Sequence, residues 1–200
     1  MAPDIARRGE PAAATPHRGG WLPVRPPERL RDAADRLFTA QGIRAVSIDA
    51  LASAANVPKS GFYRHFTSKD DLVLDYLTRA STRFRESLVT IEAGHSAAAA
   101  RLTALLDTAP DNAIMLNAIA EYRGSHPDMT LLLSRHRQWI RQWIHNQVVD
   151  HAPDEASFVA LELAAIFDAF TLEAGDGVEA EQVRRVFDAV VDRTVGRGEP

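Results

Sequence analysis

The side chains with the clearest chemical purpose lie in one short segment, between Ser47 and Lys69. It begins as a helix that Ser47 is suited to cap, followed by apolar residues at helical spacing. Asn56 comes where the chain must turn, and Asn enters the left-handed region at less cost than most residues with a side chain. Pro58 then favours the first turn of a new helix. The segment therefore predicts two short helices joined by a tight turn.

The second of these helices separates apolar from polar side chains. Phe62 and Phe66 are expected to be buried, while the donors around them point outward. A helix that enters the major groove of DNA needs this division, because outward donors bind base edges and phosphates while the aromatic rings hold the helix in place. Lys59 and Ser60, at the start of the helix, are placed for base edges. The full set of candidate DNA contacts is Ser47, Lys59, Ser60, Tyr63, Arg64, His65 and Lys69.

The same residues resemble a known bacterial signature. The run AANVPKSGFYRHFTSKDDL is similar to the DNA-binding motif of the tetracycline-repressor (TetR) family, and the preceding PERLRDAADRLFTAQGI resembles that family's first helix. The match covers residues 27–80. The resemblance implies a homodimeric transcriptional regulator, usually a repressor, that binds a palindromic operator and releases it when a small molecule binds its C-terminal domain.

Three positions depart from the family pattern. Asn56 stands where the family usually has Gly, which is physically acceptable at a turn. Gly61 replaces a hydroxyl residue and lowers helix propensity. Asp49 carries a negative charge where a basic or hydroxyl residue would suit a phosphate better. The last two departures argue against specific DNA contacts from Gly61 and Asp49.

Composition and charge are compatible with a protein that touches DNA at one end. The net charge is −4, but residues 1–80 hold 12 Lys or Arg against 9 Asp or Glu, and residues 81–200 hold 11 against 18. The only two lysines of the chain, Lys59 and Lys69, both fall inside the motif. The chain has no Cys, so neither a disulfide nor a thiolate metal site can form, which fits a reducing, cytoplasmic location.

The pattern along the chain predicts an all-α protein in three parts. Residues 1–26 are rich in Pro, Gly, Ala and Arg and are expected to be a flexible tail, whose arginines form either a minor-groove arm or a solvated extension. Residues 27–70 are expected to form the three-helix helix–turn–helix domain. Residues 71–200 are expected to form a helical ligand-binding and dimerisation domain. Its helices are predicted near residues 70–92, 96–108, 111–122, 128–149, 155–174 and 179–195.

The last two helices predict either a dimer interface or a closed core. The segment FVALELAAIFDAFTL is apolar around most of its circumference, so more than one neighbour must cover it. The final helix supplies one cover, and a second copy of the pair would supply the other across a two-fold axis, as in the resembled family. A monomer in which both helices complete the core is the alternative. The candidate interface residues are Phe158, Leu161, Ala165, Val183, Phe187 and Val190.

Large side chains of the middle helices are candidates for a ligand cavity. Pockets in helical bundles are mostly apolar with a few polar anchors, which favours an apolar or aromatic effector. An aromatic stripe at helical spacing is also typical of plain core, so that alternative stays open for each residue. The candidate ligand-binding residues are Met115, Tyr122, His126, His136, Trp139, Trp143, Phe167 and Phe170, with Asn117 or Glu121 as further polar points.

Catalytic patterns are missing from the sequence. The seven His residues form no close metal-binding pair, and the chain has no P-loop, no nucleophile elbow and no dinucleotide-binding glycine run. We therefore expect no enzyme activity, no metal and no cofactor. The sequence indicates a ligand-responsive regulator that binds double-stranded DNA as a homodimer. The alternative is a helical ligand-binding or protein-interaction module that no longer binds DNA.

Overall fold

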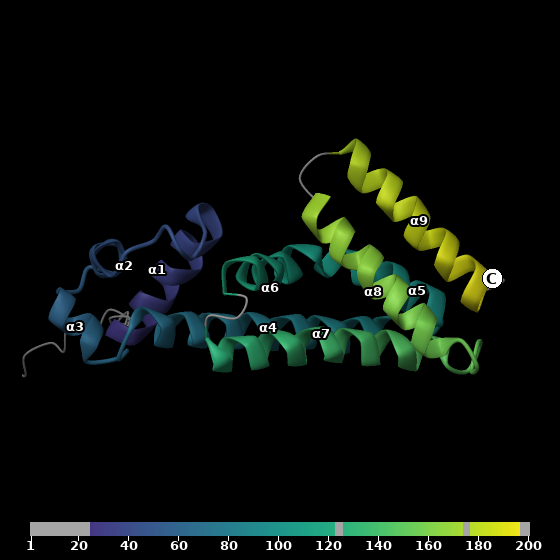
Figure 1. The fold of residues 1–200 in the computed structure, drawn as a ribbon, viewed down its shortest axis with the longest axis horizontal. Helices are drawn as coiled ribbons and strands as arrows, with labels where there is room; N and C mark the ends of the chain where they lie inside the picture. The colour runs from purple at the N-terminus through teal and green to yellow at the C-terminus, as the bar shows by residue number, and fades with distance from the viewer. Residues whose placement is uncertain (1–24, 123–125, 174–176, 197–200) are drawn as a thin grey trace, which may run out of the picture.

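The computed structural model describes residues 25–122, 126–173 and 177–196, and over these residues the chain is all α-helical, as predicted (Figure 1). The predicted tail lies outside the described residues except for its last two. The helices are α1 (Pro26–Gln41), α2 (Ile48–Ala54), α3 (Lys59–Tyr63), α4 (Lys69–Gly94), α5 (Ala98–Leu105), the 3₁₀ turn η1 (Leu106–Thr108), α6 (Ala109–Tyr122), α7 (Pro127–Val148), α8 (Ala156–Glu173) and α9 (Val178–Val195).

The expected helix boundaries hold to within a few residues, with one informative difference. The helix predicted to end at Thr108 turns into η1 at Leu106, and α6 begins at Ala109 rather than Asp111. Pro110 thus lies inside the first turn of α6 instead of in a break. A proline is tolerated there because the N–H groups of a helix's first turn have no partner within the helix.

Helices α1, α2 and α3 form a small unit, called the headpiece below, at one end of the molecule (Figure 1). Its centre consists of side chains that are almost fully buried: Leu30, Phe38, Leu51 and Phe62 are 0–4% exposed. Phe62 and Phe66 are both buried, as the sequence pattern predicts. The apolar faces of three short helices therefore pack on one another and leave their polar faces outside.

Helix α4 connects the headpiece to the rest of the protein. Its first half, including Tyr76 and Leu77, packs in the apolar cluster of the headpiece, and its second half, including Phe84 and Leu88, packs in a second cluster. The first cluster also takes in Met115 of α6 and parts of α7. The domain boundary expected at residue 70 stays a prediction, but the buried cluster crosses it.

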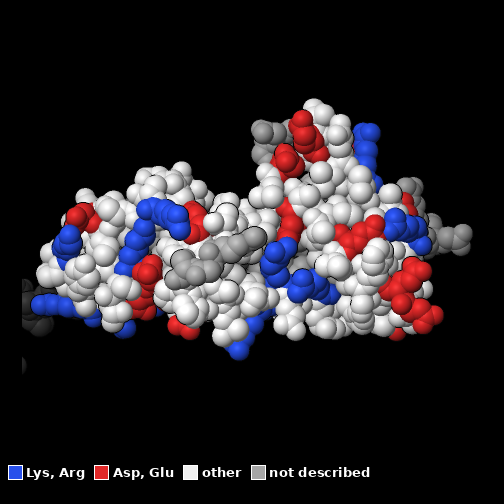
Figure 2. All heavy atoms as spheres, in the orientation of Figure 1, with Lys and Arg blue, Asp and Glu red and all other residues white. Residues whose placement is uncertain are grey.

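Helices α5 to α9, with the second half of α4, make up the body of the molecule. Helix α8 packs against α6, α7 and α9, and α9 also packs against α5. In the space-filling view, acidic side chains gather at the end of the body away from the headpiece, while the headpiece carries blue and red side chains side by side (Figure 2). Among the described residues, no helix is both long and apolar enough to span a membrane.

Candidate nucleic-acid interface and neighbouring sites

The turn between α2 and α3 has the geometry that the sequence predicts. The Ser47 hydroxyl accepts a hydrogen bond from the backbone N–H of Ala50 at 3.1 Å, which caps α2. Asn56 has a φ of 51°, in the left-handed region, and is the one residue other than glycine with a positive φ in the described chain. The Val57 N–H then donates to the carbonyl of Ala52 at 2.9 Å. Helix α3 follows directly from Pro58.

Most of the candidate DNA contacts are exposed on α3 or directly after it. Ser60, Tyr63, Arg64 and His65 all lie at the surface, and the large ring of Tyr63 is 51% exposed. Such donors are available to base edges and phosphates without any change of fold. Gly61 lies against the preceding turn, because a Cβ there would come within 3.3 Å of Pro58 Cδ. This close approach gives a structural reason for glycine at a position where the related motif often has a hydroxyl residue.

Lys59 is exposed too, but its ammonium group has a partner. Lys59 Nζ lies 2.9 Å from Asp49 Oδ1, and both side chains are more than half exposed. The hydrogen bond to Asp49, followed by the attraction between the two charges, raises the pKa of Lys59. Asp49 thus forms an exposed ion pair beside the candidate interface, with the lysine that is expected to bind a base.

Lys69 is placed differently from the other candidates. Its ammonium group donates to the carbonyl oxygen of Arg44 at 3.2 Å, and its side chain is partly buried at the start of α4. Burial lowers the pKa of Lys69. The structure therefore gives Lys69 a contact that joins α4 to the loop between α1 and α2. Its predicted phosphate contact stays a prediction.

Glu121, near the end of α6, also binds this loop. Its Oε1 accepts a hydrogen bond from the N–H of Ile43 at 3.0 Å, and its Oε2 accepts from the N–H of Arg44 at 2.6 Å. The sequence suggests Glu121 only as a polar point in a ligand cavity, and the structure places it against the headpiece instead. Nothing in the local sequence pairs α6 with a loop nearly eighty residues earlier, so only the tertiary fold reveals this contact.

The candidate ligand-binding residues do not surround one common cavity. Met115 and Phe167 are fully buried in separate apolar clusters, and His126 precedes α7 as its N-cap residue. Trp139 and Trp143 line a surface cavity of about 170 Å³ between α4 and α7. Tyr122 lines another, of about 210 Å³, between α6 and α7. Packing distributes the eight candidates over several sites, so some are plain core, and ligand binding by the others stays a prediction.

His136 lies in a chain of buried polar groups. Its Nδ1 is 3.0 Å from the Ser81 hydroxyl, and its Nε2 is 3.3 Å from Asn112 Oδ1. The Asn112 amide in turn donates to Thr171 Oγ1 at 3.1 Å and to Asp168 Oδ1 at 3.4 Å. Burial, with a smaller contribution from the positive charge of Arg85, lowers the pKa of His136 to about 4. A neutral ring with Nε2 protonated satisfies both contacts, so this histidine is a bonded core residue.

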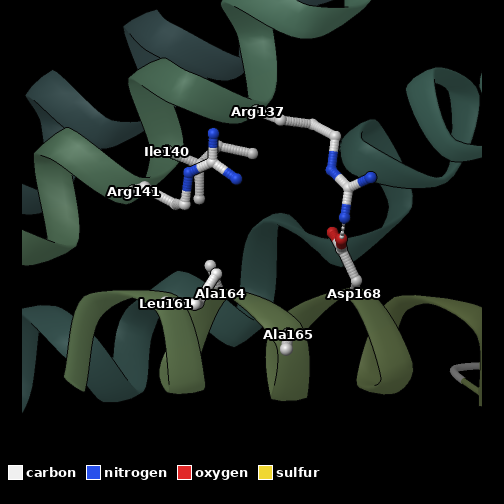
Figure 3. A pocket seen from close by; sticks show the side chains of 7 residues that line it. All are labelled: Arg137, Ile140, Arg141, Leu161, Ala164, Ala165 and Asp168. Atoms are coloured by element: carbon white, nitrogen blue, oxygen red, sulfur yellow. Dashed lines mark hydrogen bonds and ion pairs between the residues drawn. The ribbon is translucent and has the colours of Figure 1, made fainter. Parts of the chain in front are cut away.

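Asp168 completes this chain at the surface between α7 and α8. Arg137 donates to Asp168 Oδ2 at 2.6 Å, across a narrow cavity of about 40 Å³ that Arg141, Leu161 and neighbouring residues line (Figure 3). Asp168 therefore forms an ion pair within the chain. A cavity of this size has room for little more than a water molecule.

The six candidate interface residues divide into two groups. Phe158 and Leu161 of α8 are 68% and 53% exposed, and Ala165 is exposed on the same helix. By contrast, Phe187 and Val190 of α9 are 0% and 2% exposed, because they pack in the chain's own core. The expectation that these two α9 residues meet a partner is therefore corrected. The remaining candidate, Val183, is partly buried against the same core.

Metal ligands do not cluster in the part of the chain that the structure describes. No group of three or more His, Asp or Glu side chains there is arranged to hold a metal ion.

Comparison with known proteins points to one family. Residues 30–76 match the family model described as "Bacterial regulatory proteins, tetR family". An uncharacterised HTH-type transcriptional regulator of Mycobacterium tuberculosis is 36% identical over 76 residues, which cover 36% of this chain and 38% of that protein. The HTH-type transcriptional regulator TcmR of Streptomyces glaucescens is 30% identical over 97 residues, covering 46% and 43%. The matched stretches thus span about two-fifths of the length of these curated relatives.

Solved structures extend the similarity over the whole described fold. A TetR-family transcriptional regulator from Streptomyces coelicolor has a TM-score of 0.75 and 27% identity, covering 86% of this chain and 96% of that one. A TetR transcriptional regulator from Legionella pneumophila, at 18% identity and a TM-score of 0.73, shows the same fold.

The helix–turn–helix headpiece on a helical body places the chain in the class of HTH-type transcriptional regulators. Within that class, residues 30–76 match the TetR family model, and the fold is similar to that of solved TetR-family regulators.

Proposed function

We propose that the protein binds a palindromic DNA operator as a homodimer, represses transcription from it, and releases it when a small molecule binds the body. The observation that carries this proposal is the headpiece. Its α3, anchored by buried Phe62, presents Lys59, Ser60 and Tyr63 to solvent, and Arg64 follows at the end of the helix. A recognition helix of this kind reads the major groove with the residues at its N-terminal end.

Selection from a random duplex library tests DNA binding directly. We expect a two-fold symmetric site, and we expect affinity to fall by orders of magnitude between about 50 and 200 mM salt as counterions are released. Lys59→Ala should weaken discrimination at one base pair in each half-site, by about 1–3 kcal/mol. If selection enriches no sequence at any salt concentration, the protein is instead a helical module that no longer binds DNA.

A second copy of this chain is the proposed partner of α8. Phe158, Leu161 and Leu172 of this helix are 53–68% exposed. Large apolar side chains that gather on one exposed surface are typical of a protein–protein interface. A two-fold axis beside α8 would bury the stripe against its own copy and place two headpieces on successive half-sites. Ultracentrifugation at micromolar concentration tests this, because a monomer would remove the proposal.

The open cavity between α6 and α7 is the proposed effector site. Ile119, Tyr122 and Leu133 make its walls apolar, and Thr130, Ser134 and Arg137 add a few polar groups. That composition suits a small apolar or aromatic molecule. A compound that releases the operator should lose its effect in Ile119→Trp, which fills the cavity, while operator binding persists. If the emission of Trp139 and Trp143 responds instead, with Trp21→Phe removing the third tryptophan, the cavity between α4 and α7 is the site.

A further inference from the structure

Arg44, in the loop between α1 and α2, is held from two sides. Its N–H donates to Glu121 Oε2 of α6 at 2.6 Å, and its carbonyl accepts from Lys69 Nζ of α4 at 3.2 Å. The Ile43 N–H donates to the other oxygen of Glu121 at 3.0 Å. Two adjacent backbone donors on one carboxylate form a charge-assisted pair, which is stronger than bonds between neutral groups.

The loop is shaped to let the carboxylate approach. Gly42, the residue before this pair, has a φ of 79°, and a Cβ there would lie 3.2 Å from Glu121 Oε1. A side chain at this position would be strained by the backbone and would crowd the carboxylate. The turn therefore lets two adjacent backbone N–H groups reach the Glu121 carboxylate, with no side chain at Gly42 to block it.

The headpiece is also attached to the body through α1, which packs on α4. Two ion pairs join those helices, between Arg31 and Asp75 at 2.8 Å and between Arg79 and Asp35 at 2.9 Å. Contacts along a single helix leave the headpiece able to turn about that helix. A second attachment, from the different helix α6, opposes such a rotation.

We propose that Glu121 is a positioning residue for DNA binding, which fixes the angle of the headpiece on the body through the backbone N–H groups of Ile43 and Arg44. This rests on the proposed operator binding. In a dimer, the angle of each headpiece sets the distance between the two recognition helices. The separation of the two recognition helices in turn determines which spacing between DNA half-sites the dimer can bind.

The sharpest variant is Glu121→Gln, which keeps the length of the side chain and one acceptor oxygen but points an amide NH₂ at the second backbone donor. Glu86→Gln is the matched control, because it removes the same charge from an exposed residue of α4 whose side chain makes no hydrogen bond or ion pair among the described residues. Both variants should fold as the wild type does, which circular dichroism checks.

The test uses the selected operator and versions of it with one or two base pairs added to or removed from its centre. We expect the wild type and Glu86→Gln to prefer one spacing strongly. Glu121→Gln should keep the same half-site sequence but lose about tenfold of the preference between spacings, as expected for one charge-assisted bond. A mere loss of stability would weaken binding at all spacings alike. Unchanged spacing preference in Glu121→Gln would overturn the proposal.

A DNA-free measurement separates this inference from the proposed function. Amide hydrogen exchange at Ile43 and Arg44 should be at least tenfold faster in Glu121→Gln than in the wild type and in Glu86→Gln. If the wild type selects no operator, operator binding fails, and exchange alone decides whether Glu121 holds the loop. Equal exchange rates in all three proteins would overturn the positioning role.

Discussion

Lys59 illustrates how a residue that is expected to bind DNA is engaged before DNA arrives. Its ion pair with Asp49 joins the first turn of α2 to the first turn of α3. Exposed pairs of this kind contribute little to stability. The pair matters more for the proposed DNA complex, in which Lys59 would exchange this carboxylate for a base or phosphate while the carboxylate stays close to the DNA.

We therefore predict that Asp49→Asn tightens DNA binding. Removing one negative charge from the interface and freeing Lys59 should raise affinity for all duplexes several-fold at low salt, while the free energy of unfolding changes by less than about 1 kcal/mol. Fluorescence anisotropy with operator and random duplexes measures the effect. Asp154→Asn, which makes the same charge change far out on the body, is the control and should have little effect. Weaker binding by Asp49→Asn would show that Asp49 orients Lys59 productively.

At the scale of elements, α8 carries two different apolar faces. Val159, Leu163 and Phe167 are buried among neighbouring helices, while Phe158 and Leu161 are exposed. The uniformly apolar sequence of this helix indicates that it is covered on more than one side. The sequence of α8 does not show that Phe187 of α9 is buried in the chain's own core. Because Phe187 is buried there, only part of the predicted interface remains available to a partner.

This division predicts opposite outcomes for two charge substitutions. Leu161→Glu should leave the helical content unchanged and convert the dimer to monomer, because it places a charge in the proposed interface. Phe187→Asp should instead unfold the protein, with a loss of more than about 3 kcal/mol, because it buries a carboxylate in the core. Ultracentrifugation and thermal melting followed by circular dichroism distinguish the two.

Leu131→Glu provides the control for the interface variant. Leu131 is 48% exposed on α7, so the same change there should leave the association constant as it is. A Leu161→Glu protein that dimerises as tightly as the wild type would place the interface elsewhere.

At the scale of the whole molecule, the polar chain through His136 joins four helices. Ser81 belongs to α4, Asn112 to α6, His136 to α7 and Thr171 to α8. A satisfied buried network of this kind makes the packing of the body specific. It also makes the stability of the body dependent on pH.

Stability should fall on acidification between about pH 6.5 and pH 4. The pKa of His136 is lowered to about 4 in the folded protein, against 6.5 when it is free, so over this range the unfolded chain binds a proton that the native protein excludes. The contribution is fully present above pH 6.5 and is lost progressively below it, by up to about 3 kcal/mol. Arg85 opposes protonation, while the Asp168 carboxylate, one residue further along the chain of bonds, is paired with Arg137.

Urea unfolding at several pH values measures this dependence. His136→Gln should be less stable than the wild type at pH 7 but should show a flatter loss of stability towards pH 4. His95→Gln, at an exposed position, should keep the wild-type dependence. Equal slopes for the wild type and His136→Gln would contradict a depressed pKa at this position.

Local rules determined much of what the sequence revealed. Ser47, Asn56 and Pro58 act through their own backbone and the adjacent turn, so the two helices and the turn of the motif are predictable from residue types alone. Helical spacing likewise predicts the buried rings of Phe62 and Phe66 and nearly all the helix boundaries, because a helix and its apolar face are properties of neighbouring residues.

Tertiary structure alone decided which distant groups meet. Glu121 and Arg44 are far apart in sequence, and no periodicity relates an acid near the end of α6 to a loop before α2. The orientation of Phe187 depends on which face of α9 packs on α8, since an amphipathic helix shows that it has an apolar face but not which neighbour covers it. The sequence determined the motif and its resemblance to a known family. The packing of the helices decided where the headpiece is attached and which residues remain at the surface.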